Sequence, residues 1–141
     1  MAAVRSAHAQ WQGDLATGGG TVTVDSSALP ETEVTWKARA EGSDSVTSPE
    51  ELIAAAHSSC MSMALTNGLT KAGYQPTSVR VTAEVSFQAG EGITGSHLTV
   101  RAQVTDISAA DFTSAAEEAK ANCPVSKALT GTTITLDATL E

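Results

Sequence analysis

Two cysteines carry the most reactive side chains of this chain, and they stand in different local settings. Cys60 lies in the middle of an apolar, helix-like stretch, whereas Cys123 precedes Pro124 where one helical pattern ends and another begins. Each could be a small buried hydrophobe, since free cysteines are commonly buried. Together they suit a reactive pair, in which one sulfur is attacked and the other resolves the product. At an N-cap, Cys123 would also benefit from the anion-stabilising end of the helix that follows.

His57 precedes Cys60 by three residues, which places both side chains on one face of a helix. Its imidazole could hydrogen-bond a thiolate, or it could be a core histidine whose nitrogens are satisfied by other groups. With Cys123 these residues would supply three zinc ligands, but a structural zinc site needs a fourth. His8 and His97 have no evident grouping with these three residues that would supply the fourth ligand. The sequence therefore predicts that the protein has no metal site.

Glu50 lies near the start of the helix that carries Cys60, where a carboxylate stabilises the positive end of the helix dipole. Ten residues of helix, about 15 Å, separate Glu50 from Cys60, so it could reach such a thiol only from an antiparallel, symmetry-related subunit. Arg39 falls on the polar face of a predicted strand, where simple solvation would explain it. Its guanidinium could instead pair with Glu50 and stabilise a thiolate.

The strongest helix signal covers about residues 48–71. Ser48 and Glu51 match a capping box, with Pro49 at the first helical position. Gly73 is expected to end the helix. Because the segment is apolar almost all round, it should be buried on every side. A chain of 141 residues can hardly enclose such a helix alone, so we expect a dimer that surrounds it.

A second helix is predicted from the residue after Ser108 to about Asn122, where Pro124 interrupts the pattern. Cys123 is then placed to be the N-cap of a short final helix over residues 124–129. Both cysteines are therefore expected on or beside helices.

Alternation of apolar and polar residues predicts the strands. They cover residues 34–41, 79–88, 98–105 and 134–141, with a shorter N-terminal hairpin formed by residues 7–12 and 21–25. Antiparallel strands segregated from helices define the α+β class. We expect one domain over residues 1–141, because the length is ordinary for a single domain and no linker divides the chain.

The composition excludes some partners. A formal net charge of −8 argues against nucleic acid and against an anionic membrane surface. No apolar run approaches the roughly 20 residues that span a bilayer, and the first residues lack the apolar region of a signal peptide. We therefore expect a cytoplasmic protein whose thiols are kept reduced.

Specific segments resemble a known family. Residues 48–65 (SPEELIAAAHSSCMSMAL) resemble the central helix of the OsmC/Ohr peroxidases, and residues 122–129 (NCPVSKAL) resemble their second cysteine motif. Residues 9–14 (AQWQGD) and 134–137 (ITLD) also fit, so the resemblance covers essentially the whole chain. His57 and the Cys-Pro-Val-Ser run are more similar to the osmotically inducible OsmC branch than to the organic hydroperoxide resistance branch.

The resemblance implies an intertwined α+β homodimer with active sites at the subunit interface. It implies an antioxidant, stress-response thiol peroxidase without haem, flavin or metal. Cys60 matches the peroxidatic cysteine and Cys123 the resolving cysteine, while Glu50 matches the acidic active-site position and Arg39 the arginine of the OsmC branch. These matches imply a Cys60 sulfenic acid, a redox-active Cys60–Cys123 disulfide and an external dithiol reductant. The apolar surroundings favour organic hydroperoxides over hydrogen peroxide as substrates.

Two other classes of function compete with a peroxidase. A thiol redox sensor or binding module would use the same disulfide to switch a partner, and would turn over peroxide slowly. A structural protein would keep both thiols buried and inert toward peroxide and alkylating agents while folded.

Overall fold

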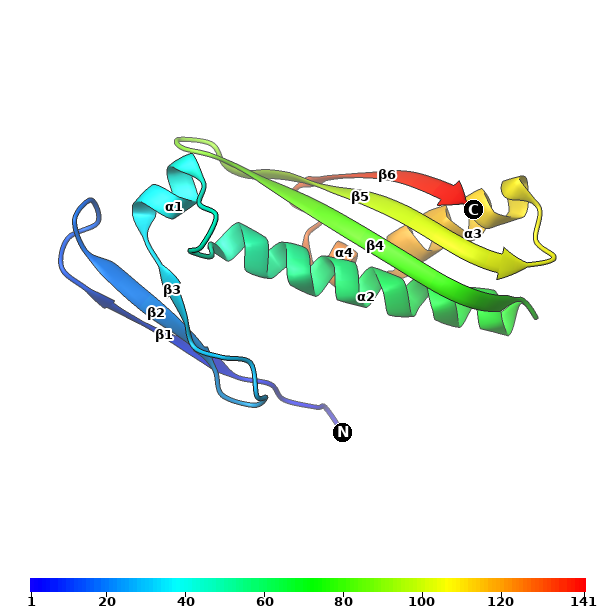
Figure 1. Cartoon of the computed structure of the whole chain (residues 1–141). Helices are drawn as coiled ribbons and strands as arrows, with labels where there is room; N and C mark the ends of the chain where they lie inside the picture. Colours follow the sequence, from blue (N-terminus) through cyan, green and yellow to red (C-terminus); the bar gives the residue numbers. More distant parts are fainter. The chain divides into compact units, whose positions relative to one another are not determined.

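The computed structural model describes all 141 residues, Met1–Glu141. They divide into two compact units, residues 1–50 and residues 51–141 (Figure 1). The first unit carries Arg39 and Glu50, and the second carries both cysteines.

The N-terminal unit contains a three-stranded antiparallel sheet in the order β1–β2–β3. Its strands are β1 (Ala7–Gln12), β2 (Gly19–Val24) and β3 (Thr32–Val34), and the first two confirm the predicted hairpin. Gly20 is required in this hairpin, because a Cβ at that position would clash with the backbone carbonyl of Gln10.

The predicted strand over residues 34–41 is wrong beyond its first residue, because Trp36–Glu41 form the short helix α1. Thr35 caps this helix with its hydroxyl, which accepts a hydrogen bond from a backbone N–H of the first turn, and Gly42 ends it at φ 87°. Lysine, alanine, arginine and glutamate favour helix intrinsically, and here this preference and the cap override the alternating pattern. Arg39 therefore projects from the last turn of a helix rather than from a strand.

The long helix α2 (Pro49–Lys71) has the predicted bounds. It ends in a Schellman motif, in which the Tyr74 N–H donates to the Leu69 carbonyl and the Gly73 N–H donates to the Thr70 carbonyl. Gly73 has φ 91°, a left-handed conformation that glycine adopts without strain.

The sheet of the C-terminal unit has the order β4–β5–β6. Its strands are β4 (Gln75–Gln88), β5 (Gly92–Thr105) and β6 (Thr133–Leu140), which confirm the three predicted strands. β4 and β5 are antiparallel, but β5 and β6 are parallel, so the expectation of purely antiparallel sheets is wrong. The physical reason is the crossover: α3 (Ala109–Asn122) and α4 (Pro124–Ala128) lie between these strands in the chain and allow a parallel return.

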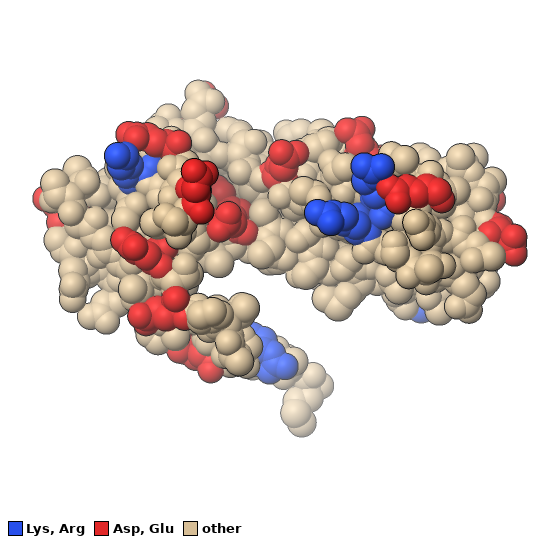
Figure 2. All heavy atoms as spheres, viewed as in Figure 1, with Lys and Arg blue, Asp and Glu red and all other residues tan.

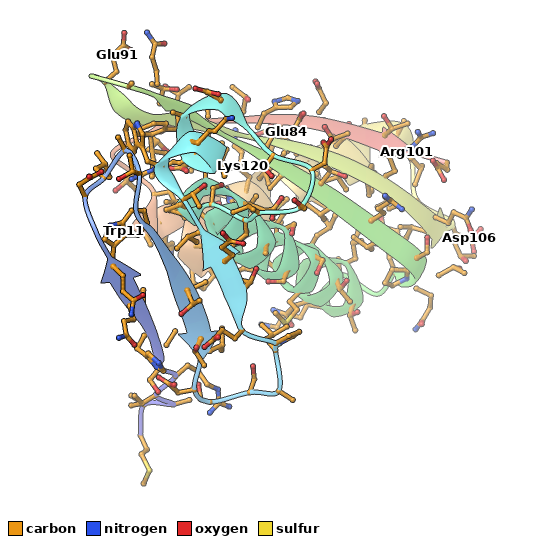
Figure 3. The ribbon with its side chains drawn as sticks, turned by 60° about the vertical axis from the view of Figure 1, so that its left-hand side comes forward. Trp11, Glu84, Glu91, Arg101, Asp106 and Lys120 are labelled. Atoms are coloured by element: carbon orange, nitrogen blue, oxygen red, sulfur yellow. The ribbon has the colours of Figure 1, made fainter.

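The core of this unit lies between one face of the sheet and the helices (Figure 1). Its fully buried aliphatic and aromatic residues come from α2, β5 and α3: Met61, Leu65, Leu69, Leu98, Val100, Ala102, Phe112 and Ala116. Polar residues such as Glu84 and Arg101 are exposed on the sheet (Figure 3). This two-layer packing fixes α2 and the α3–α4 junction against one another.

Only one stripe of α2 is buried in the C-terminal unit, formed by His57, Met61, Leu65 and Leu69 at four-residue spacing. Met63 is 66% exposed and Leu52 is 38% exposed on the rest of the helix surface. A single chain therefore does not bury this helix on every side.

Charged side chains are interspersed on the face shown in Figure 2, where basic residues form small groups beside acidic ones. The formal net charge is −8. None of the helices is both long enough and apolar enough to cross a membrane.

Candidate active site

The C-terminal unit brings Cys60 and Cys123 together. Cys60 projects from the middle of α2, and Cys123 is both the C-cap of α3 and the N-cap of α4. Both are free thiols, and their side chains hydrogen-bond each other. Cys60 is half-buried, whereas Cys123 has an exposed fraction of 0%. The pair therefore has one partly exposed cysteine and one that is fully buried.

The helix break at Pro124 fixes the position of Cys123. Proline is favoured at the first position of a helix, and it starts α4 directly after Cys123. The Cys123 N–H donates to the Ala119 carbonyl at 2.8 Å, and the Cys123 carbonyl accepts from the Lys127 N–H at 3.0 Å. Because the backbone is held on both sides, the thiol of Cys123 has little freedom to move away from Cys60.

The two thiols have opposite pKa shifts. Burial raises the pKa of Cys60, and the adjacent Cys123 raises it further against an opposing hydrogen bond from the Val125 backbone. Burial also raises the pKa of Cys123, but hydrogen bonds from the Ser126 backbone N–H, the Cys60 thiol and the Ser126 hydroxyl outweigh it, so this pKa is lowered. Of the two thiols, Cys123 therefore ionises more readily, and Cys60 can donate a hydrogen bond to it.

His57 is a fully buried histidine that hydrogen-bonds two serines rather than Cys60. Its Nδ1 lies 2.7 Å from Ser96 Oγ, and its Nε2 lies 2.8 Å from Ser126 Oγ. Burial lowers the pKa of His57, so the imidazole is neutral at pH 7. Of the two roles left open by the sequence, the structure favours the satisfied core histidine. Ser126 nevertheless links it to Cys123.

Ser96 and Ser126 are partners of His57 that were not among the site residues predicted from the sequence. Ser96 belongs to the inward-facing row of β5 that continues with Leu98, Val100 and Ala102, all of them buried. Extending the predicted strand by two residues would have placed a hydroxyl in an apolar row, which signals a buried polar partner. Ser126 lies three residues after Cys123, and on a short helix that spacing lets the two side chains meet.

Arg39 and Glu50 form an ion pair within the N-terminal unit. Arg39 donates from Nε at 3.0 Å and from Nη2 at 2.8 Å, both to Oε1 of Glu50. Glu50 is only 5% exposed, and its Oε2 is buried without a hydrogen-bond partner. The structure thus groups the four residues singled out from the sequence as two pairs, one charged pair and one thiol pair.

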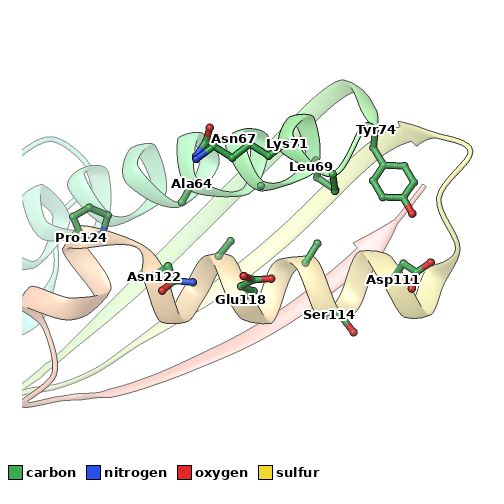
Figure 4. A pocket seen from close by; sticks show the side chains of 14 residues that line it. Ala64, Asn67, Leu69, Lys71, Tyr74, Asp111, Ser114, Glu118, Asn122 and Pro124 are labelled. Carbon is green, nitrogen blue, oxygen red and sulfur yellow. The ribbon is translucent and has the colours of Figure 1, made fainter.

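A groove of about 750 Å³ lies between α2 and α3 (Figure 4). Asn67 and Lys71 line it from α2, and Ser114 and Glu118 line it from α3. Neither cysteine lines this groove, but Asn122 and Pro124, which flank Cys123, do. No group of three or more histidine, cysteine or acidic side chains in the chain could hold a metal ion.

Two reduced thiols in contact, one accessible and one held as the better anion, define a thiol-based redox protein on an α+β scaffold. The model of the family described as OsmC-like protein matches residues 42–137. The chain is 43% identical over 136 residues to the peroxiredoxin OsmC of Escherichia coli, covering 94% of each protein. The chain therefore belongs to the OsmC-like family, and it is a peroxidase.

Solved structures share this fold. An OsmC-like protein from Mycoplasma pneumoniae has a TM-score of 0.75 at 14% identity, with 99% of each chain covered, which shows the shared fold. An organic hydroperoxide resistance protein from Elizabethkingia anophelis has a TM-score of 0.68 at 26% identity, covering 100% of this chain and 99% of its own. The higher identity to OsmC than to this second protein agrees with the OsmC branch.

Proposed function

We propose that this peroxidase reduces organic hydroperoxides in preference to hydrogen peroxide, with Cys60 as the nucleophile and Cys123 as the resolving cysteine. The observation that carries the proposal is the contact between two reduced thiols of unequal exposure. A peroxide must reach the sulfur that it oxidises, and only Cys60 is accessible, since Cys123 is 0% exposed.

The reaction has three steps. The Cys60 thiolate attacks the distal oxygen of the hydroperoxide, the O–O bond breaks, and the leaving alkoxide takes a proton and departs as an alcohol. Cys60 is then a sulfenic acid. The Cys123 sulfur attacks the Cys60 sulfur, so that an S–S bond forms, the S–O bond breaks and water leaves. An external dithiol reduces the disulfide by exchange, becomes oxidised itself and restores both thiols. No metal or organic cofactor takes part.

The opposite pKa shifts of the two thiols call for a cation beside Cys60. Within the thiol pair Cys123 has the lowered pKa, whereas the proposed attack needs a thiolate at Cys60. The Arg39 guanidinium is the group we assign to this task, because a nearby cation lowers a thiol pKa. Glu50 holds Arg39 through Oε1, and its second, unbonded oxygen is available to accept a hydrogen bond in the reacting site.

The charged pair would act on the thiol of a second copy, so we propose an intertwined homodimer. Glu50 and Cys60 are ten residues apart on one helix, about 15 Å, which is too far for contact within a subunit. The exposed apolar residues of α2, Leu52 and Met63, give a second copy a surface to bury. In this assembly residues 1–141 act as one OsmC-like domain.

The preference for organic substrates has support from the apolar surface near Cys60. Ile53 lies two helical turns before Cys60 on the same face of α2 and is half-buried. Leu52 beside it is 38% exposed. An alkyl chain bound along this surface would gain about 25 cal/mol per Å² of apolar area removed from water, which hydrogen peroxide cannot do.

The test is peroxide consumption by the purified protein with a dithiol reductant, with cumene hydroperoxide and hydrogen peroxide compared. We expect faster turnover of the organic substrate, none in Cys60→Ser, and a single oxidation event without efficient recycling in Cys123→Ser. Full multiple turnover by Cys123→Ser would exclude the resolving role. Oxidation of both thiols with slow turnover would indicate a redox sensor instead.

A further inference from the structure

A continuous row of buried polar groups leads from the sheet to the thiol pair. Ser96 on β5 is 2% exposed, His57 on α2 is 0% exposed, and Ser126 on α4 is 5% exposed. The row is held by the contacts of His57, 2.7 Å to Ser96 Oγ and 2.8 Å to Ser126 Oγ. Ser126 lies three residues after Cys123, the N-cap of α4, and hydrogen bonding from its side chain lowers the pKa of Cys123. Three elements thus join at one histidine.

The direction of these hydrogen bonds follows from the donor capacity of each group. When Cys123 carries the charge, its sulfur only accepts, so the Ser126 hydroxyl donates to it. Ser126 Oγ must then accept from Nε2–H of His57. A neutral imidazole has a single N–H, so Nδ1 accepts a hydrogen bond from the Ser96 hydroxyl.

We propose that Ser96, His57 and Ser126 form a relay that positions the resolving cysteine: Ser96 fixes the Nε2–H tautomer of His57, and His57 fixes the Ser126 hydroxyl as a donor to Cys123. The proposal rests on the proposed function, because it assigns these residues to the resolving half of that reaction. None of them touches the peroxide, so all three are positioning residues.

The relay makes Cys123 ready to attack. In the resolving step the Cys123 thiolate forms the S–S bond with the Cys60 sulfenic acid, the S–O bond breaks, and hydroxide leaves and takes a proton from solvent. The Ser126 backbone N–H and, to a smaller extent, the Ser126 hydroxyl lower the pKa of Cys123 and so increase the fraction present as thiolate, the form that attacks. His57 does not act as the base, since burial lowers its pKa and opposes an imidazolium. Among the groups that shift the pKa of Cys123, only Cys60 is itself titratable.

A purely structural role makes a different prediction. Ser96→Ala and Ser126→Ala each remove one hydroxyl from the same buried imidazole and leave one ring nitrogen unpaired. Their effects on stability should therefore be similar. Only the relay predicts that both also change the ionisation of Cys123, and that Ser126→Ala changes it more.

The experiment is a pH titration of thiolate absorbance in a Cys60→Ser background, where Cys123 is the only thiol. We expect Ser126→Ala to raise the Cys123 pKa by about one unit, a tenfold loss of thiolate below that pKa. Ser96→Ala should raise it by a smaller amount. Ser62→Ala is the matched control, because its hydroxyl bonds only the Ser59 carbonyl of the same helix, and it should change nothing.

A ¹⁵N correlation spectrum of the reduced protein supplies the second readout, and we expect the Nε2–H tautomer of His57. An unchanged Cys123 pKa in Ser126→Ala would overturn the relay, as would an Nδ1–H tautomer. A shift in Ser126→Ala with none in Ser96→Ala would remove His57 and Ser96 from it. These readouts need no peroxide, so they fail independently of the proposed function, whose own failure would appear as no Cys60–Cys123 disulfide in peroxide-treated wild-type protein.

Discussion

A peroxidatic thiol needs both access to solvent and a low pKa. In this molecule the two properties belong to different cysteines, Cys60 and Cys123. Cys60, in the middle of a long helix, has access to solvent, but burial and its neighbour raise its pKa. Cys123, at a helix junction, has donors from the following turn that lower its pKa, but no exposed surface. Each thiol therefore has what the other lacks.

This difference shows why two cysteines alone do not make an efficient peroxidase. In the proposed mechanism the peroxide reacts with the thiol of higher pKa, so a group outside the pair would have to lower that pKa. Arg39, held by a buried carboxylate, has the required charge and fixed geometry. Variants that remove or strengthen one of the groups around the thiols should change the difference in pKa or in exposure between Cys60 and Cys123 in a defined way.

The largest effect should come from removing the cation. We expect Arg39→Met to lower the rate of Cys60 oxidation by about 10²–10³-fold, the usual loss when one preorganised electrostatic donor is removed. It should also raise the pKa of Cys60, measured from the pH dependence of alkylation.

The same variant leaves the buried Glu50 carboxylate without its guanidinium, which should cost about 1–3 kcal/mol of stability. The double variant Arg39→Met/Glu50→Gln removes that unpaired charge and serves as the control. Its stability should recover while its activity does not. Recovery of both would show that Arg39 acts only through folding.

The next largest effect should come from a substitution on the exposed surface of α2, the helix that carries Cys60. Met63 is 66% exposed, and we expect Met63→Asp to place a charge in the proposed subunit interface and weaken dimerisation by at least about tenfold, or 1.4 kcal/mol. Sedimentation equilibrium measures this change. Glu84→Gln, an exposed substitution on the sheet, should leave the association constant unchanged. A Met63→Asp protein that assembles like wild type would place the interface elsewhere.

The free energy of unfolding should decrease at low pH because of His57, the buried histidine that is linked to Cys123 through Ser126. Burial lowers the pKa of His57 from 6.5, so the unfolded chain binds a proton there more readily than the folded chain does. The full contribution of neutral His57 to the free energy of unfolding is present above pH 6.5 and is lost as the pH falls below that value. The free energy of unfolding then changes by at most about 1.4 kcal/mol per pH unit. Urea denaturation between about pH 7.5 and 5 should show this slope in wild type and lose it in His57→Gln. An equal slope in both proteins would assign it to other groups.

The smallest effects should come from two glycines of the helix region, and they test whether stability and thiol ionisation are independent. Gly73 has φ 91° with no neighbour within 4 Å, so Gly73→Ala should cost about 1 kcal/mol through backbone strain alone. Gly68 lies inside α2 and also has no neighbour within 4 Å of an added Cβ. Gly68→Ala should therefore stabilise the protein by about 0.5–1 kcal/mol. Thermal unfolding measures both. A changed pKa of either thiol in these variants would mean that helix stability controls the active site.

The sequence predicted those parts of the molecule that local patterns control. α2 follows from a proline at its start and a glycine after its end, and the strands of the C-terminal unit follow from strict alternation. The junction at Cys123 follows from Pro124, which can start a helix but cannot continue one.

The failures have a common cause, which is that the deciding interactions are not local or are very short. The six residues of α1 gave an alternation that a strand would also give, and only their helix propensity and the Thr35 cap distinguished them. The parallel pairing of β6 depends on the crossover through α3 and α4. Ser96 and Ser126 meet His57 across 39 and 69 residues of chain, so a local pattern can indicate a buried hydroxyl but cannot identify His57 as its partner.

The most direct test of the account is the location of the first oxidised sulfur. Reduced wild-type protein is mixed with one equivalent of cumene hydroperoxide in the presence of dimedone, and the adduct is mapped by peptide mass spectrometry, with Cys123→Ser analysed in parallel to prevent disulfide closure. The account predicts the sulfenic acid adduct on Cys60 in both proteins. An adduct on Cys123 in the wild type would show that the thiol of lower pKa, rather than the accessible thiol, is the nucleophile, and would exclude Cys60 from that role.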